Sequence, residues 1–240
     1  MTLVLSSSLG TTAAMWAPLE AHLGGLATLA YEHRGHGPGP APPGPYSLAE
    51  LGGDVLALLD AQGVARASFC GVSLGGMVGM WLAAHHPERV QRLVLCCTAA
   101  HLDPGSFRER AALVRRVGTP AVVADAVVER WLTPDYAQRN PDVVDSLRAQ
   151  LVATPAEGYA GCCEAIAGMD LRGDLGAIAA PTLCIAARED LATPPEHLGR
   201  IAAAVPGARL EILSPAAHLA PVQRAQTVAA LVLDHLRSDP

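Results

Sequence analysis

The chain has 240 residues, enough for one large α/β domain or two smaller ones with a sizeable apolar core. Half of its residues are hydrophobic, and no apolar run reaches the roughly 18 residues that a membrane-spanning helix needs. The net charge of −6 and the lack of a basic cluster argue against nucleic acid or an anionic membrane as partner and favour a small-molecule substrate. Because the start lacks the basic residues of a secretory signal, we expect a soluble cytoplasmic protein.

The first predicted unit is a strand, a loop and a helix. A short apolar strand, Leu3–Leu5, leads through a polar loop into a helix predicted over 15–22. A loop between a strand and a helix can present a free backbone N–H to an oxygen atom that becomes negatively charged during a reaction. Here that donor would be the amide of Leu9. A polar turn that caps the helix at Thr11 or Thr12 explains the loop equally well.

The second unit contains a long irregular connection. A strand is predicted over 26–31, and the proline-rich stretch over 38–45 predicts a stiff surface excursion without helix or strand. Ser47 lies three residues before Glu50, which is the spacing of a capping box. We therefore expect a helix over 48–62.

The sequence Gly71-Val72-Ser73-Leu74-Gly75 is typical of a nucleophile elbow, where a strand breaks sharply into a helix. The serine backbone is strained there, so the residues two positions away on either side must lack a Cβ. Strand-like residues precede Ser73 and a helical pattern over 77–84 follows it, as the motif requires. The turn places Ser73 at a helix N-terminus, and the amide of Leu74 would be the second oxyanion donor.

After a strand predicted over 92–97, the alternation of strands and helices stops. Residues 99–175 show only helical periodicity, in 108–117, 121–131, 141–151 and 158–167. A helical block between strands of an α/β sheet is typical of an inserted lid. We therefore predict a hydrolase core formed by 1–98 and 176–240, and a helical lid formed by 99–175.

The strand pattern then returns in 181–187 and 209–213, with helices predicted over 195–205 and 222–236. About six strands thus alternate with helices, and the connections are long enough for a mostly parallel sheet with right-handed crossovers. Ser73, Asp190 and His218 each follow a strand directly. Because the carboxyl ends of parallel strands meet at one edge, we expect these three side chains to lie together where ligands bind.

These three residue types suit nucleophilic catalysis. A serine hydroxyl attacks at neutral pH only when a base removes its proton, and an imidazole such as that of His218 can do so. A carboxylate must hold that imidazole in the correct tautomer, and Asp190 is the candidate. The order Ser73, Asp190, His218 is that of the α/β-hydrolase triad. Glu189 is the alternative carboxylate, but the shorter aspartate is the usual partner.

The other titratable side chains have simpler explanations. Asp103 is an alternative acid that belongs to the predicted lid, and His101 is better placed as a substrate contact or a surface residue than as the base. His33 and His36 lie on a glycine-rich turn with no third ligand nearby, so we interpret them as turn-stabilising and expect no metal. The cysteines show no metal-ligand spacing and are interpreted as reduced core residues, at positions Cys70, Cys96, Cys97, Cys162, Cys163 and Cys184.

Short segments spread through nearly the whole chain carry a more specific resemblance: Ser8–Thr11 with Met15-Trp16, Arg34–Gly37, Pro43–Leu48, Gly71–Gly76, Arg130-Trp131, Gly158–Cys163, Met169–Arg172 and Ala217–Leu219. In these segments the chain resembles the α/β-hydrolase-fold enzymes and, among them, the 3-oxoadipate enol-lactonases. It differs in beginning at the strand that carries Leu3, so we expect the N-terminal hairpin usual in the fold to be absent. A sheet edge left open in this way invites pairing with a second copy, which makes a homo-oligomer one expectation.

The resemblance implies hydrolysis of an enol-lactone through an acyl-enzyme on Ser73, in aromatic catabolism by the β-ketoadipate pathway and without a metal or organic cofactor. Arg130, beside Trp131 in the lid, is then the candidate for binding a substrate carboxylate, although a helix-surface arginine beside a core tryptophan is the alternative. Two other functions stay open. One is a general carboxylesterase or perhydrolase with the same triad, and the other is a non-catalytic relative that binds a small ligand.

Overall fold

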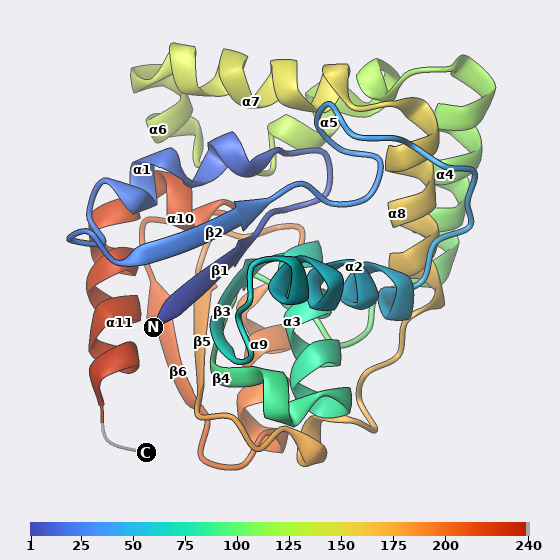
Figure 1. The fold of residues 1–240 in the computed structure, drawn as a ribbon. Coiled ribbons are helices and arrows are strands. Elements are labelled where there is room, and N and C mark those ends of the chain that lie inside the picture. Colours follow the sequence, from blue (N-terminus) through green and yellow to red (C-terminus); the bar gives the residue numbers. More distant parts are fainter. Residues whose placement is uncertain (239–240) are drawn as a thin grey trace.

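The computed structural model describes residues 1–238. One parallel sheet in the order β2-β1-β3-β4-β5-β6 runs through the molecule (Figure 1). Its strands are β1 (Thr2–Ser6), β2 (Ala27–Tyr31), β3 (Ala67–Val72), β4 (Val90–Cys96), β5 (Thr182–Ala187) and β6 (Arg209–Leu213). The predicted parallel sheet of six strands is confirmed.

Helices fill the connections between these strands. The α-helices are α1 (Ala17–Glu20), α2 (Leu48–Ala61), α3 (Leu74–His85), α4 (Pro104–Val117), α5 (Ala124–Val128), α6 (Pro134–Arg139), α7 (Pro141–Ala153), α8 (Ala156–Gly168), α9 (Pro195–Ala204), α10 (Ala220–Gln223) and α11 (Ala225–Arg237). Short 3-10 helices are η1 (Ala13–Trp16), η2 (Pro87–Arg89), η3 (Pro120–Val123) and η4 (Leu175–Ala177).

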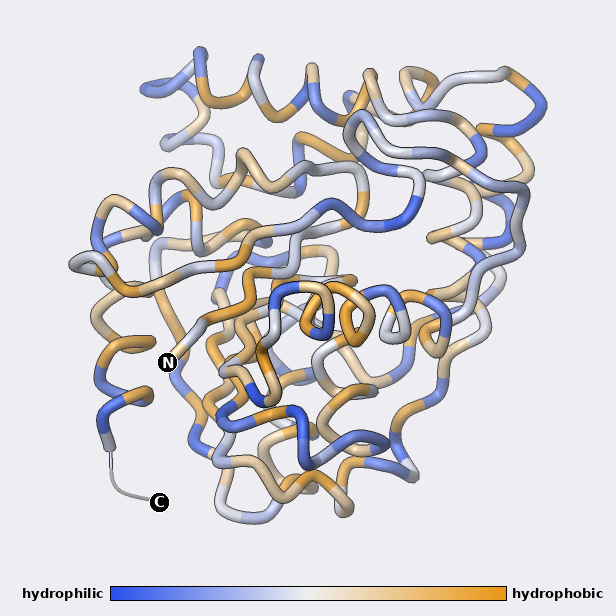
Figure 2. The backbone as a smooth tube through the Cα atoms, in the orientation of Figure 1, coloured by the Kyte–Doolittle hydropathy of each residue, from blue (hydrophilic) through white to orange (hydrophobic). Residues whose placement is uncertain are grey.

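The core is centred on the inner strands. Strands β3 and β5 are buried along their whole length, as expected of parallel strands that helices cover on both faces. The outer strands β2 and β6 are partly or fully exposed. Figure 2 shows apolar residues concentrated along the central strands. Because β2 forms one edge of the sheet, homo-oligomer formation through that edge stays a prediction.

The helices form layers around the sheet. Helices α2 and α3 pack together on one side, while α1, α10 and α11 pack together on the other (Figure 1). Helices α4 to α8 follow one another between β4 and β5 and lie at the top and right of Figure 1. The segment predicted to be a lid therefore contains five α-helices and, across its residues 99–175, no strand.

The structure differs from the predicted elements at four points. The helix expected over 15–22 is the 3-10 helix η1 followed by the short α1, which ends at Glu20. The helix expected over 121–131 is the 3-10 turn η3 followed by α5, and the six-residue α6 was not predicted because it is too short to show periodicity. The last helix is divided into α10 and α11, because Arg224 has φ −124° and ψ 38°, outside the helical region. The capping box is confirmed: the Ser47 hydroxyl accepts from the Glu50 amide at 3.2 Å, and Glu50 accepts from the Ser47 amide at 2.9 Å.

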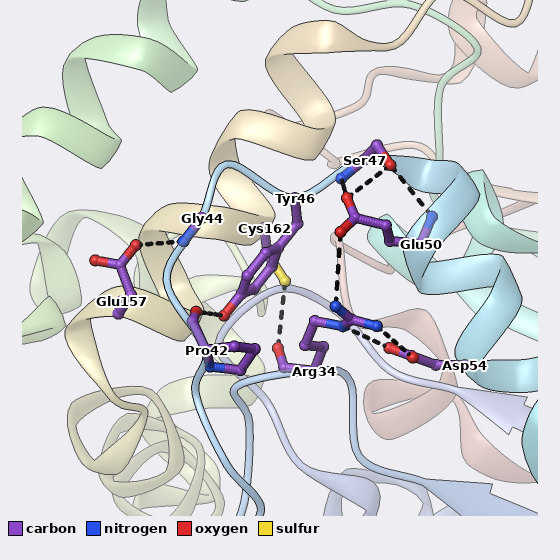
Figure 3. Close-up of polar contacts among 9 residues, drawn as sticks. All are labelled: Arg34, Pro42, Gly44, Tyr46, Ser47, Glu50, Asp54, Glu157 and Cys162. Carbon is purple, nitrogen blue, oxygen red and sulfur yellow. Dashed lines mark hydrogen bonds and ion pairs between the residues drawn. The ribbon is translucent and has the colours of Figure 1, made fainter.

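The proline-rich stretch has no regular structure, as predicted, and it holds helix α8 in place (Figure 3). The Gly44 amide donates to Glu157 of α8 at 2.8 Å. The ring of Tyr46 lies so close to α8 that a Cβ on Gly161 would come within 2.6 Å of it. Arg115 of α4 also donates to Glu157, at 2.6 Å. Helix α8 is thus attached both to the core and to a neighbouring helix of the block.

Candidate active site

Ser73 occupies the turn between β3 and α3. Its φ of 55° is in the left-handed region, which costs a residue with a Cβ about 1–3 kcal/mol. A Cβ on Gly71 would lie 2.3 Å from the carbonyl carbon of Gly75, and a Cβ on Gly75 would lie 2.0 Å from the carbonyl oxygen of Ser6. The expectation that both positions require glycine is confirmed.

Hydrogen bonds hold the strained turn. The Ser73 amide donates to the Cys96 carbonyl at 3.1 Å, and the Thr98 hydroxyl donates to the Ser73 carbonyl at 2.7 Å. The Gly75 amide donates to the Ser7 carbonyl at 3.0 Å, which attaches the elbow to the loop after β1. The backbone around Ser73 is therefore fixed by the neighbouring strand ends.

The structure brings Asp190 and His218 into contact. Asp190 follows β5, His218 follows β6, and both side chains are buried. The imidazole Nδ1 donates to Oδ2 of Asp190 at 2.9 Å, which leaves Nε2 as the acceptor. Burial raises the pKa of Asp190, but the adjacent His218 and donors from Thr193 outweigh it and lower the pKa to about 2. Asp190 is therefore ionised at neutral pH.

The alternative residues have other partners. Glu189 accepts from the Ser214 hydroxyl and the Ala216 amide, each at 2.8 Å, and does not contact the imidazole of His218. Asp103 caps α4 by accepting from two amides of its first turn. His101 lines a different cavity, which also contains Arg172 and His197.

A cavity of about 260 Å³ joins the predicted site residues. Ser73, His218, Leu9, Arg130 and Trp131 all line it. The elbow and the loops after β1 and β6 provide one part of its wall, and residues from α4, α5 and α8 provide another. These five residues, which are spread along the sequence from position 9 to position 218, therefore line one small cavity.

The backbone amides of Leu9 and Leu74 are the two predicted oxyanion donors. Leu9 lines the cavity, and Leu74 follows Ser73 as the first residue of α3. Among residues 1–238, no protein group accepts a hydrogen bond from either amide. Both N–H groups are therefore available to a ligand atom.

The loop that carries Leu9 is braced by two histidines. The Gly10 amide donates to Nε2 of His36 at 2.9 Å, and Nε2 of His33 contacts the Ser7 carbonyl at 3.0 Å. Burial lowers the pKa of His33 to about 4 and, with repulsion from His33, that of His36 to about 3. Both imidazoles are therefore neutral at pH 7. Through these contacts they stabilise the loop after β1 rather than the turn on which they were expected to act.

Comparison with known proteins identifies the family. The family model described as the alpha/beta hydrolase fold matches residues 2–225. The chain belongs to the alpha/beta hydrolase fold family. The parallel sheet with its covering helices and the sharp turn at Ser73 agree with that assignment.

Two enol-lactonases are similar to this hydrolase over most of its length. It is 39% identical over 227 residues to 3-oxoadipate enol-lactonase 2 of Acinetobacter baylyi, covering 93% of this chain and 84% of the relative. The crystal structure of the enol-lactonase from Burkholderia xenovorans LB400 superposes with a TM-score of 0.95 at 44% identity, covering 99% of this chain and 91% of that one. A Stutzerimonas stutzeri protein named as the carbamate hydrolase RutD is 32% identical, covering 98% of this chain and 91% of the relative. Family and relatives together make this chain an ester hydrolase.

Sequence reasoning missed three residues of the candidate site. Arg110 of α4 and Tyr159 of α8 line the cavity beside Arg130. Thr193 donates from its hydroxyl to Asp190 at 2.8 Å and lies 3.3 Å from Nδ1 of His218. Tyr159 was within one of the resembling segments, but nothing in the sequence indicated that it and Arg110 face the same space.

The hydrolase offers no other obvious chemistry in the part that the structure describes. Within residues 1–238, no group of three or more His, Cys, Asp or Glu side chains is placed to hold a metal ion. No helix in this part is both long and apolar enough to cross a membrane. All six cysteines are buried, which confirms that they are residues of the interior.

Proposed function

We propose that this hydrolase opens an enol-lactone, such as 3-oxoadipate enol-lactone, with Ser73 as the nucleophile. The proposal is carried by one arrangement: Ser73 and His218 line the same small cavity, and His218 is held by Asp190 at 2.9 Å. The similarity to enol-lactonases over more than nine-tenths of the chain supports the choice of substrate. Such a reaction would serve the breakdown of aromatic compounds in the cytoplasm.

In the proposed reaction, Nε2 of His218 takes the proton of Ser73 as its hydroxyl attacks the lactone carbonyl. The oxyanion that forms would accept hydrogen bonds from the amides of Leu9 and Leu74, each worth about 3 kcal/mol in the transition state. The C–O bond of the ring then breaks, and the ring oxygen leaves as an enol that takes its proton from His218. The enol becomes a ketone.

Water completes the cycle. His218 takes a proton from a water molecule, whose oxygen attacks the acyl carbon bound to Ser73. Collapse of the second tetrahedral intermediate releases a carboxylate and returns the proton to Ser73. Asp190 stabilises the imidazolium in both halves of the reaction. Each step uses only side chains and amides of this chain together with water.

The cavity fits a small acidic substrate. At about 260 Å³ it is smaller than the roughly 300–1,000 Å³ of pockets that hold drug-sized ligands. We propose that the helical segment 99–175 is the lid that sets this size, and that Arg130 binds a substrate carboxylate. Arg130 lines the cavity, and its Nε donates to the Ala126 carbonyl at 3.0 Å, which leaves the other guanidinium nitrogens for a ligand.

A carbamate hydrolase is the second candidate, because relatives of that name cover almost all of the chain. The same serine, imidazole and amides would act on a carbamate carbonyl. The general carboxylesterase or perhydrolase also uses this arrangement but has no need of arginines in the cavity. The identity of the substrate therefore has to come from turnover.

A substrate screen of wild-type protein and Ser73→Ala tests the proposal. The compounds are a carboxylated enol-lactone, its methyl ester, a saturated lactone, p-nitrophenyl acetate and a carbamate. We expect the carboxylated enol-lactone to have the highest kcat/KM and Ser73→Ala to be inactive on every compound. Fluorophosphonate should label wild-type protein at Ser73 only. Arg130→Ala should raise KM for the carboxylated lactone far more than for its methyl ester. Preferred turnover of the carbamate would replace the lactone proposal.

A further inference from the structure

The cavity contains two arginines that lack a carboxylate partner. Arg110 and Arg130 both line it, and across residues 1–238 neither forms an ion pair. Burial, followed by repulsion from Arg110, lowers the pKa of Arg130, so the two guanidinium groups are close enough to disfavour each other's charge. Like charges gathered in a partly buried site are stabilised when an anion binds between them.

Among the described residues, the one acidic side chain that lines the cavity has other hydrogen-bond partners. Asp103 lines the same cavity, but its two carboxylate oxygens accept from the amides of Gly105 and Ser106 at the start of α4, at 3.3 and 3.2 Å. Arg110, one turn further along α4, instead lies over the ring of Phe107, with 5.0 Å between the guanidinium carbon and the ring centroid. The positive charge of Arg110 is thus not neutralised by its own helix.

A buried tyrosine borders the same cavity. Tyr159 is fully buried and is one of the residues around the cavity, and a guanidinium N–H of Arg110 points at its phenol oxygen. Within residues 1–238 the phenol O–H donates to no protein acceptor. Burial raises the pKa of Tyr159, and the charge and N–H of Arg110 together with the charge of Arg130 oppose this only in part. The phenol therefore stays protonated and is a donor. An unpaired buried donor is costly unless a ligand atom accepts from it.

Tyr159 is held rigidly in this position. A Cβ on the preceding residue, Gly158, would lie 2.0 Å from the carbonyl oxygen of Gly35, so the start of α8 is in direct contact with the core backbone. The bond from Gly44 to Glu157 fixes the same turn of the helix (Figure 3). On its other side, the Tyr159 ring lies 3.1 Å from the place of a Cβ on Gly10. The hydroxyl has little freedom to turn towards solvent.

We propose that Arg110 and Tyr159 form, together with Arg130, a subsite that binds one free carboxylate of the substrate. The guanidinium groups and the phenol are donors only, which suits the two acceptor oxygens of a carboxylate. This inference rests on the proposed function, and it narrows the substrate to a lactone or ester that carries an acidic group. Arg110 and Tyr159 are specificity-determining residues, whereas Ser73, Asp190 and His218 would carry out the chemistry.

Competitive inhibition by a small carboxylate tests the subsite. The probe is butyrate, the neutral reference is butyramide, and the reporter reaction is hydrolysis of p-nitrophenyl acetate. In wild-type protein butyrate should bind more tightly than butyramide. The quantity compared is the inhibition constant of butyrate divided by that of butyramide. In Arg110→Gln and in Tyr159→Phe this ratio should rise at least tenfold, because a hydrogen bond to the charged carboxylate is lost. Arg110→Lys, which keeps the charge, should lie between wild type and Arg110→Gln.

Arg108→Gln is the matched control, because Arg108 is an exposed residue of the same helix and does not line the cavity. Its ratio should stay within twofold of wild type. An unchanged ratio in both Arg110→Gln and Tyr159→Phe would overturn the subsite, and so would an equal change in Arg108→Gln. Calorimetric titration of Ser73→Ala protein with butyrate measures the same preference without turnover. If butyrate binding depends on Arg110 and Tyr159 while no enol-lactone is hydrolysed, the subsite stands and the lactone proposal fails.

Discussion

Replacing Asp190 with Asn should abolish most activity while leaving the fold intact. One carboxylate oxygen, Oδ1, accepts from the amides of Ala192 at 2.8 Å and Thr193 at 3.0 Å. The other, Oδ2, accepts from the Thr193 hydroxyl at 2.8 Å and from Nδ1 of His218 at 2.9 Å. An asparagine has only one acceptor oxygen, and the two amides will keep it at the Oδ1 position. Its NH₂ group then faces His218.

This orientation reverses the hydrogen bond to the imidazole. A donor opposite Nδ1 of His218 favours the imidazole tautomer that carries its proton on Nε2. In that tautomer Nε2 cannot accept the proton of Ser73. Loss of the correct tautomer in a serine–histidine–aspartate site lowers kcat by about 10⁴-fold, or about 5.5 kcal/mol of transition-state stabilisation. The measurement is kcat/KM for p-nitrophenyl acetate, followed in wild type and Asp190→Asn under identical conditions.

The same substitution has a defined effect on stability. The pKa of Asp190 is lowered to about 2 from a reference of 3.8, so ionised Asp190 contributes about 2 kcal/mol to the free energy of unfolding. A lowered carboxylate pKa gives stability that is present above the unfolded value and is lost as the pH falls towards the folded value. At pH 7, urea denaturation should therefore show Asp190→Asn less stable by about this amount but still cooperatively folded.

Glu189→Gln provides the control, because Glu189 adjoins Asp190 and bonds only the loop around Ser214 and Ala216. Its kcat should remain within about threefold of wild type, since surface substitutions away from the site have small effects. The reasoning is refuted if Asp190→Asn keeps more than a tenth of wild-type activity, or if Glu189→Gln loses as much activity as Asp190→Asn.

Three further outcomes are expected. The free energy of unfolding should fall from pH 7 to pH 5, because His33 and His36 take up protons in the unfolded chain, where their reference pKa is near 6.5, but stay neutral in the folded protein. The loss is about 2 kcal/mol for each histidine. A urea midpoint that does not depend on pH would contradict this expectation. Gly75→Ala should lower the free energy of unfolding by about 3 kcal/mol or more, measured by urea denaturation, since the new Cβ would lie 2.0 Å from the Ser6 carbonyl oxygen. A thiol reagent such as DTNB should label the native protein slowly and all six buried cysteines only after unfolding; fast labelling of the native protein would disagree with their burial.

Much of the fold could be predicted from local patterns. Strand β6 was expected over 209–213 and has those bounds, because an apolar alternation between a helix and a loop is a short-range signal. The capping box of Ser47 and Glu50 is equally local. The two parts of the last helix could not be separated, because the break at Arg224 is a backbone conformation that helical periodicity does not reveal.

The sequence by itself determined the parallel sheet and the elbow at Ser73, because strand and helix periods and the need for glycine beside a strained serine are properties of neighbouring residues. It also indicated Asp190 and His218, since residues that follow parallel strands share one edge. Only the tertiary structure decided that Asp190 rather than Glu189 meets His218, and that Arg110 and Tyr159 face the cavity with Arg130. Those contacts depend on how separate helices and loops pack against one another. The sequence pattern does not indicate which side chains from distant segments point at each other.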